Sequence, residues 1–167
     1  MSSVNTAQLK DATFGLEPMV EHDLLEVVEI EEASGLSRWG WDGYHCELAR
    51  TGETVMLVAR LSNAAKIFLP EQRIAGFIAA RLGVGELHIN NVAVREAFRR
   101  RGIGAALLAR ALEEGRQHGA QRALLEVRAA NRAAQSLYEQ QGFSITVRRK
   151  NYYAAPPDDA LVMAVEI

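Results

Sequence analysis

The sequence predicts an α/β domain built on a mixed, mostly antiparallel β-sheet. Three apolar, strand-like segments follow one another near the middle of the chain, and such a run is a candidate for antiparallel pairing. A helical pattern and then another strand come next, and this strand–helix–strand order predicts a parallel crossover. The 167 residues suit one hydrophobic core, so we expect one domain over residues 1–167.

The first half of the chain predicts one strand, two helices and three strands. Apolar residues recur with helical spacing between Leu24 and Ile30, among carboxylates, and Ser34-Gly35 ends this helix. The three strands read TVMLVARL, RIAGFIAARL and ELHINNVAVR. The expected elements are a strand at 12–18, helices at 20–33 and 39–50, and strands at 54–61, 73–82 and 86–95, after a polar segment at 1–11 and with a polar connection around Pro70.

The second half of the chain has a plainer pattern. An apolar stripe from Ile103 to Leu112 predicts a helix that Gly119 closes, and Gly142 caps a later helix. Two closing strands are expected around a loop that contains Pro156-Pro157. The expected elements are a helix at 103–117, a strand at 122–128, a helix at 131–141 and strands at 143–149 and 160–167.

Composition and charge exclude several classes of function. The chain carries a formal net charge of −2, so we expect no direct nucleic-acid partner bound through overall charge. Cys46 is the single cysteine, so neither an intramolecular disulfide nor a cysteine-based zinc site can form. The sequence has no apolar run of membrane-spanning length and no apolar leader with basic flanks. We therefore expect a cytoplasmic protein with no membrane partner.

The sharpest local motif is RRRGIGA at residues 99–105, which follows a strand and opens a helix. Two glycines allow a tight turn that exposes backbone N–H groups, and the helix N-terminus adds partial positive charge. Three adjacent arginines add full charges, so the segment predicts a pyrophosphate cradle. The alternative is a turn with solvated arginines. Leu107 stands where a Rossmann loop requires Gly or Ala, and the Gly-Lys-Ser/Thr of a P-loop is absent.

This motif resembles the coenzyme A pyrophosphate loop of GNAT acetyltransferases, [QR]-x-x-G-x-[GA], with Arg99, Gly102 and Gly104 on the patterned positions. The likeness extends to NNVAVREAFRRRGIGAALL and LEVRAANRAAQSLYEQQGF, and it is specific over residues 86–167. Within the family it is greatest to the ribosomal-protein-alanine N-acetyltransferases of the RimI group. Two departures, Asn90-Asn91 and a longer connection at 62–72, bear on the acceptor site and leave the coenzyme site intact.

The resemblance implies the GNAT fold, with three layers, about seven strands, and fourth and fifth strands that splay apart to admit acetyl-CoA. Acetyl-CoA is the implied cosubstrate, and no metal is implied. A strand whose backbone binds the pantetheine arm can still be a buried strand, because the ligand would add as a pseudo-strand. The residues implied as cofactor-binding are Val92, Ala93, Val94, Arg100, Arg101, Gly102, Ile103, Gly104, Ala105 and Asn131.

Glu126 and Tyr138 are the candidate catalytic residues. Glu126 lies within the apolar strand LLEVR, where partial desolvation raises the pKa of a carboxyl toward that of a useful general base. The alternative for Glu126 is a structural ion pair, for instance with Arg128. Asn131 can cap the predicted helix and still reach the coenzyme. Tyr138 follows Asn131 by seven residues, so both lie on nearly one helical stripe, and core packing is the alternative for Tyr138. The resemblance implies that Glu126 is the base and that Tyr138 protonates the leaving thiolate.

Two other reactive side chains are expected to have lesser roles. His88 shares a predicted strand face with Glu86, Asn90 and Val92; we expect it to be structural, with an auxiliary base as the alternative. Cys46 lies on a predicted helix with no obvious partner base, which argues against covalent catalysis.

The predicted function is transfer of an acetyl group from acetyl-CoA to the α-amine of a protein N-terminus by direct attack in a ternary complex. KNYY at residues 150–153, expected in the last loop, resembles a segment of N-terminal acetyltransferases, which implies that Tyr152 and Tyr153 bind the substrate. The likeness implies the N-terminal alanine of a ribosomal protein as acceptor. The pKa of an α-amine, about 7.7–8.0 against about 10.4 for lysine, also favours it. The alternatives are an acetyltransferase for a lysine side chain or small amine, and a catalytically silent coenzyme-A-binding regulatory module.

Overall fold

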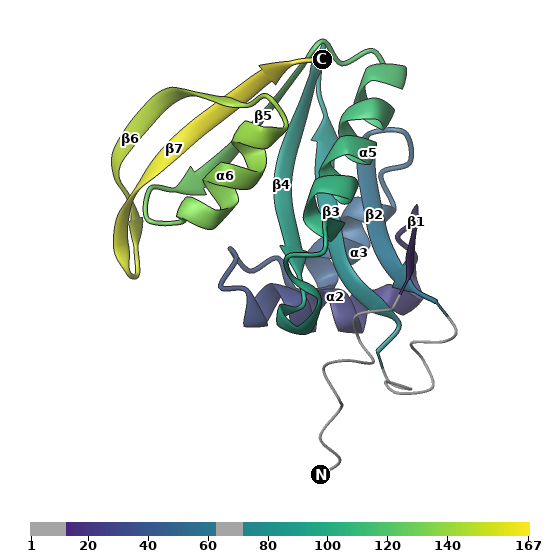
Figure 1. Ribbon diagram of the computed structural model, residues 1–167. Helices are drawn as coiled ribbons and strands as arrows, with labels where there is room; N and C mark the ends of the chain where they lie inside the picture. Colours follow the sequence, from purple (N-terminus) through teal and green to yellow (C-terminus); the bar gives the residue numbers. More distant parts are fainter. Residues whose placement is uncertain (1–12, 63–71) are drawn as a thin grey trace.

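A seven-stranded mixed sheet runs through the molecule, with helices on both of its faces (Figure 1). The computed structural model describes residues 13–62 and 72–167, so the expected polar segment at 1–11 and the connection around Pro70 lie outside the described residues. In chain order the elements are β1 (Phe14–Pro18), η1 (Glu21–Asp23), α2 (Leu24–Ala33), α3 (Gly40–Leu48), β2 (Thr54–Leu61), β3 (Ile74–Leu82), β4 (Glu86–Val94), η2 (Glu96–Phe98), α5 (Ile103–Gln117), β5 (Arg122–Arg128), α6 (Arg132–Gln140), β6 (Ser144–Ala154) and β7 (Pro157–Glu166).

The sheet has the order β1-β2-β3-β4-β5-β7-β6, and every neighbouring pair is antiparallel except β4 and β5. Helices α5 and α6 lie on one face, and α2 and α3 lie on the other (Figure 1). Each face has its own apolar layer, one beneath α5 and α6 and one beneath α2 and α3. The predicted three-layer α/β arrangement with a seven-stranded, mostly antiparallel sheet is therefore confirmed.

Strands β4 and β5 pair over a short stretch and then separate. Their parallel register runs from Glu86 opposite Arg122 to Ile89 opposite Leu125 and includes no later residue of either strand. Figure 1 shows the two strands side by side near the C-terminus and apart at their other ends. The rest of β4 still pairs with β3, so, among the residues that the structure describes, one backbone edge of β4 has no strand partner beyond Ile89.

A β-bulge interrupts β4 at this fork. The β3–β4 register passes from Ile89 to Asn91 and leaves Asn90 as an extra residue. Ile89 packs in the layer beneath α5, and beyond the bulge Val92 packs against that same layer. One inserted residue inverts the alternation of side chains along a strand. The expected common face of His88 and Val92 is therefore wrong.

The last two strands form a longer hairpin than the sequence predicted. Tyr152 and Tyr153 lie on strand β6 and not in a loop, because pairing with β7 resumes beyond Arg149 after an irregularity. Asn151 lies within this irregularity with a φ of 54°, a left-handed conformation that Asn tolerates. Pro157 is the first residue of β7. A strand can begin with proline, which has no backbone N–H to donate, so the two prolines do not require the longer loop that was expected.

Helix α2 is tied to the sheet by buried carboxylates. Asp23, at its N-terminal end, accepts hydrogen bonds from both terminal nitrogens of Arg60, at 3.0 and 3.1 Å. Glu26 accepts from the side chains of Arg73 and Arg95, each at 3.0 Å. Both acidic side chains are almost wholly buried, so these ion pairs fix where α2 sits on the sheet.

Candidate functional site

The RRRGIGA motif forms the turn that was expected at the N-terminus of α5. Arg100 and Gly102 take positive φ angles of 61° and 76°, and α5 begins at Ile103. The first turn of an α-helix leaves backbone N–H groups without intrahelical acceptors. A cleft of about 790 Å³ opens in front of these groups, between the end of β4, the turn and α6. A helix N-terminus facing a cleft is a favourable environment for a phosphate group.

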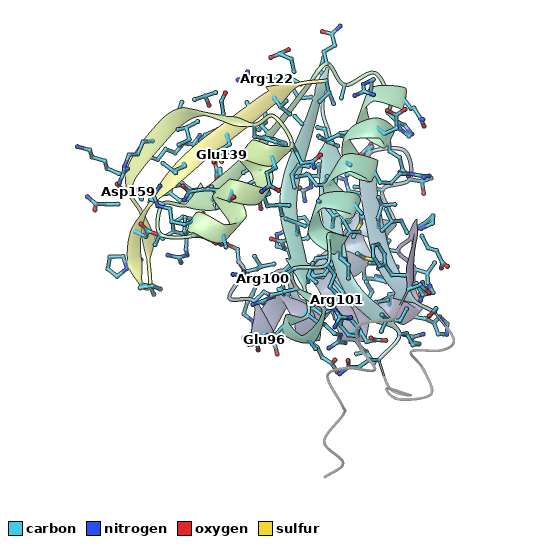
Figure 2. The ribbon with its side chains drawn as sticks, viewed as in Figure 1. Glu96, Arg100, Arg101, Arg122, Glu139 and Asp159 are labelled. Atoms are coloured by element: carbon cyan, nitrogen blue, oxygen red, sulfur yellow. The ribbon has the colours of Figure 1, made fainter. Side chains whose placement is uncertain are left out.

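The three arginines of the turn have different surroundings. Arg99 and Arg100 line the cleft, and the Arg99 Nε donates to the Val94 carbonyl at 3.0 Å. The Arg101 guanidinium lies 5.4 Å from the centre of the Phe98 ring and does not line the cleft. Figure 2 shows Arg100 on the side of the turn toward α6 and Arg101 on the side away from it. Arg100 is thus the better placed of this pair to meet an anion in the cleft.

Gly104, in the first turn of α5, lies close to Leu137 on α6. A Cβ atom at this position would lie 3.3 Å from Cδ2 of Leu137 on α6. Ile103, Gly104 and Ala105, which the resemblance implies as pyrophosphate-binding residues, all line the cleft. Val92, Ala93 and Val94 line it from the other side, on the part of β4 that has left β5.

A second cleft, of about 530 Å³, joins the first at the fork between β4 and β5. It is lined by His88 and Asn90 from β4, Glu126 from β5, and Tyr152 and Tyr153 from β6. The residues that line both clefts are Ser34, Leu36, Val92, Asn131, Ala134 and Tyr138. Two ligands, one in each cleft, would therefore meet beside Tyr138.

Tyr138 and Asn131 lie on the α6 side of this junction. Tyr138 is 7% exposed, and burial raises its pKa to about 12, with a smaller contribution from Tyr153. Its hydroxyl therefore stays protonated near neutral pH and is a potential acid. Asn131 caps α6, because its Oδ1 accepts from the Ala134 N–H at 3.1 Å. This helix cap was expected from the sequence. Asn131 and Tyr138 both line the two clefts, which agrees with their expected places on nearly one helical stripe.

Glu126 lies in the second cleft with part of its carboxylate accessible. Its Oε1 accepts a hydrogen bond from Nη1 of Arg149 on β6 at 2.7 Å. An ion pair was the alternative considered for Glu126, but the partner is Arg149 and not Arg128. Arg128 instead lies over the Tyr153 ring, with its Cζ 4.0 Å from the ring centre.

The two tyrosines of β6 form an aromatic wall of the second cleft. Tyr152 and Tyr153 meet edge to face, with ring centres 5.1 Å apart, and Tyr152 is about half exposed. Burial raises the pKa of Tyr153, and the nearby Glu126 charge raises it further. An accessible aromatic ring beside a buried one can pack against an extended peptide.

Sequence reasoning missed the loop between α2 and α3 as part of the site. Ser34 and Leu36 line both clefts, and Gly35 and Ser37 line the second. Ser34-Gly35 was read only as a helix end, and nothing local indicates that the loop lies beside β4. Cys46 is exposed and is not among the residues that line either cleft.

Within residues 13–62 and 72–167, no helix has both the length and the apolar character needed to cross a membrane. In the same ranges, no three or more His, Cys, Asp or Glu side chains are grouped so that they could hold a metal ion.

Comparisons with known proteins match this geometry. The family model described as Acetyltransferase (GNAT) family matches residues 24–143. The ribosomal protein bS18-alanine N-acetyltransferase of Salmonella typhimurium is 39% identical over 99 residues, 58% of this chain and 67% of that protein. The crystal structure of the ribosomal-protein-S18-alanine N-acetyltransferase from Escherichia coli has a TM-score of 0.76 and 27% identity, covering 93% of this chain and 94% of that one. Arabidopsis thaliana NAA60 in complex with acetyl-CoA has a TM-score of 0.79 at 18% identity, covers 93% of this chain and 99% of its own, and shows likeness of fold alone.

Proposed function

This chain belongs to the acetyltransferase (GNAT) family, and on that basis we propose that it acetylates the N-terminal α-amine of a protein, with the N-terminal alanine of ribosomal protein bS18 as its acceptor. Two relatives are named for that activity. The Salmonella typhimurium enzyme is 39% identical over 99 residues, and the Escherichia coli enzyme of known structure has 27% sequence identity to this chain. A ribosomal acceptor would place the reaction in the cytoplasm.

The observation that carries the proposal is the pair of joined clefts with Tyr138 at their junction. The first cleft offers arginines, helix N–H groups and an unpaired strand edge, which suit a phosphorylated and extended ligand. The second offers a carboxylate and aromatic rings, which suit an amine and a peptide. Two substrates can therefore lie end to end, and no covalent enzyme intermediate is required.

The residues of the first cleft fit acetyl-CoA, which supplies the activated acetyl thioester. The Arg100 side chain and the backbone from Arg101 to Ala105 would hold the pyrophosphate, with Asn131 beside them at the N-cap of α6. The free edge of β4 from Val92 to Val94 would form main-chain hydrogen bonds with the pantetheine arm. A backbone N–H in this stretch would also stabilise the negative charge that develops on the carbonyl oxygen.

The proton transfers are assigned to Glu126 and Tyr138. As the amine nitrogen bonds to the acetyl carbon, Glu126 accepts the amine proton, directly or through a water molecule. As the carbon–sulfur bond breaks, the Tyr138 hydroxyl gives its proton to the leaving thiolate. The raised pKa of Tyr138 supports its role as the acid, because the hydroxyl is protonated at the start of the reaction.

The acceptor assignment rests on the second cleft and on the acidity of the amine. Tyr152 and Tyr153 would clamp an extended peptide that presents its amine to Glu126. At pH 7 a far larger fraction of an α-amine than of a lysine side chain is neutral, since their pKa values are about 7.7–8.0 and about 10.4. The competing functions are acetylation of a lysine side chain or a small amine, and a silent coenzyme-binding module.

Two peptides test this assignment. One has a free N-terminal alanine and no lysine, and the other has a blocked N-terminus and one internal lysine. Release of free coenzyme A thiol is followed with each peptide and acetyl-CoA. We expect the first peptide to be preferred; a preference for the second would favour lysine acetylation. No thiol release with either peptide or with small amines would favour the silent module.

A further inference from the structure

The loop between α2 and α3, residues 34–39, forms a wall of both clefts. Ser34 and Leu36 line the first cleft, whereas Ser34, Gly35, Leu36 and Ser37 all line the second. The loop therefore contributes more to the second cleft, where the acceptor is proposed to bind. Figure 1 shows it beneath α6, projecting beyond the sheet near the separated end of β4.

A buried carboxylate holds the end of this loop. Glu31, near the C-terminus of α2, is wholly buried. Its Oε1 accepts from the Trp39 backbone N–H at 2.7 Å, and its Oε2 accepts from the Gly40 N–H at 3.1 Å. These two N–H groups belong to the first turn of α3, where a negative charge is favourable. Glu31 thus closes the loop by joining the helix before it to the helix after it.

Tyr44 and Asn91 connect this carboxylate to the bulge of β4. The hydroxyl of Tyr44 on α3 donates to Glu31 Oε1 at 2.9 Å and accepts from Asn91 Nδ2 at 2.8 Å. All three side chains are less than 5% exposed. Burial, and then the charge of Glu31, raise the pKa of Tyr44 far above its ordinary value, so the hydroxyl keeps the proton that it donates.

Glu31 differs from the other buried acids of this region. Asp23, Glu26 and Glu47 each form ion pairs with arginines. Within the described residues, no Lys, Arg or His lies close enough to Glu31 for an ion pair, and its hydrogen bonds come from the loop end and from Tyr44. An unpaired buried charge is costly, and an apolar residue would serve α2 packing better. The buried charge of Glu31 therefore serves to hold the α2–α3 loop in position.

We propose that Glu31, Tyr44 and Asn91 form a positioning relay that fixes the α2–α3 loop relative to the β4 bulge and so sets the shape of the acceptor cleft. Asn91 lines that cleft together with Asn90 and Val92, so one end of the relay lies at the strand and the other at the loop. Glu31 and Tyr44 are not among the residues that line either cleft, so they act on the acceptor through the loop and through Asn91. The relay rests on the proposed function only for the identity of the acceptor.

Tyr44→Phe tests the relay because it removes one hydroxyl and leaves the ring in place. Ile30→Val is the matched control, since Ile30 is buried on α2, the helix that carries Glu31, and shortening it loosens α2 packing without removing a hydrogen bond of the relay. The measurements are the KM for acceptor, the KM for acetyl-CoA, kcat, and amide hydrogen exchange at Trp39 and Gly40. The acceptor is the N-terminal alanine peptide or, if the wild type rejects it, whichever amine the wild type accepts.

We expect Tyr44→Phe to raise the acceptor KM about tenfold, a factor that corresponds to about 1.4 kcal/mol. The KM for acetyl-CoA and kcat should change by less than about twofold, and exchange at Trp39 and Gly40 should become faster than in Ile30→Val. Equal acceptor KM and equal exchange in the two variants would refute the relay. Rejection of the alanine peptide by the wild type would refute the proposed acceptor alone, because the exchange comparison and the remaining amines still decide the relay.

Discussion

Gly104→Val is the substitution that most directly tests the phosphate-binding role of the α5 N-terminus. Gly104 does not have a positive φ, so a side chain causes no backbone strain. An added Cβ would lie 3.3 Å from Leu137 Cδ2 and 3.8 Å from Val94 Cγ2, so alanine requires a shift of only a few tenths of an ångström. Valine adds two methyl groups to this narrow space. They must displace Leu137 or enter the cleft.

The expected loss can be estimated from the contacts that a phosphate would make there. A hydrogen bond to a charged group contributes about 1.5–3 kcal/mol, and the helix dipole adds about 0.3–1 kcal/mol. Displacing the ligand from one helix N–H and from the dipole therefore costs roughly 2–4 kcal/mol. That cost weakens coenzyme binding by roughly 30- to 1000-fold. Valine is no worse a helix former than glycine, so the fold should survive.

Titration calorimetry with coenzyme A measures this loss, and thermal unfolding shows that each variant is folded. Gly104→Ala should bind within a few-fold of the wild type. Leu137→Ala removes the packing partner and leaves the loop unobstructed, so its affinity separates disturbed α6 packing from a blocked cleft. A folded Gly104→Val protein with wild-type affinity would show that the phosphates bind elsewhere.

The remaining predictions concern four side chains. Tyr138→Phe and Glu126→Gln should each lower turnover by roughly 10²–10⁴-fold with little change in acetyl-CoA affinity, and near-full turnover at saturating peptide would remove the assigned roles. Burial raises the pKa of Tyr138 to about 12, so its hydroxyl stays protonated well above neutral pH. We therefore expect no loss of kcat from deprotonation of Tyr138 between about pH 7 and 10. A fall of kcat in that range that is absent in Tyr138→Phe would contradict this expectation. Asn90→Leu should raise the free energy of unfolding, measured in urea, by about 1 kcal/mol, because among the described residues the buried Asn90 Oδ1 has no hydrogen-bond partner. A loss of stability would show that Asn90 has such a partner. Cys46→Ser should keep full activity, and an acetyl thioester trapped on Cys46 by mass spectrometry would overturn the direct mechanism.

Features set by neighbours in sequence were predicted well. The apolar stripe of α5 and the terminating Gly119 placed this helix at residues 103–117, and the structure has it there. Asn131 was predicted as a helix cap, and it caps α6. Each of these depends on residues within one or two helical turns, so the local pattern contains the whole cause.

Features set by distant residues could not be predicted. Glu31 is buried because Trp39, Gly40 and Tyr44 supply its hydrogen bonds, and its carboxylate charge alone indicated an exposed position. Glu126 pairs with Arg149, which comes from a strand 23 residues later that lies at the far edge of the sheet. The bulge at Asn90 also gives no local signal, because it arises from the register with β3.

The fork between β4 and β5 explains why the site lies where it does. A strand edge with unpaired N–H and C=O groups is costly unless something hydrogen-bonds to it. Beyond Ile89, β4 no longer pairs with β5. The edge that this leaves unpaired faces the first cleft, which Val92 to Val94 line. A ligand with an extended amide chain would pair with that edge and also contact α6, which belongs to the half of the fold beyond the fork. The same separation admits the acceptor beside Glu126, so the opening that makes one cleft necessarily makes the other.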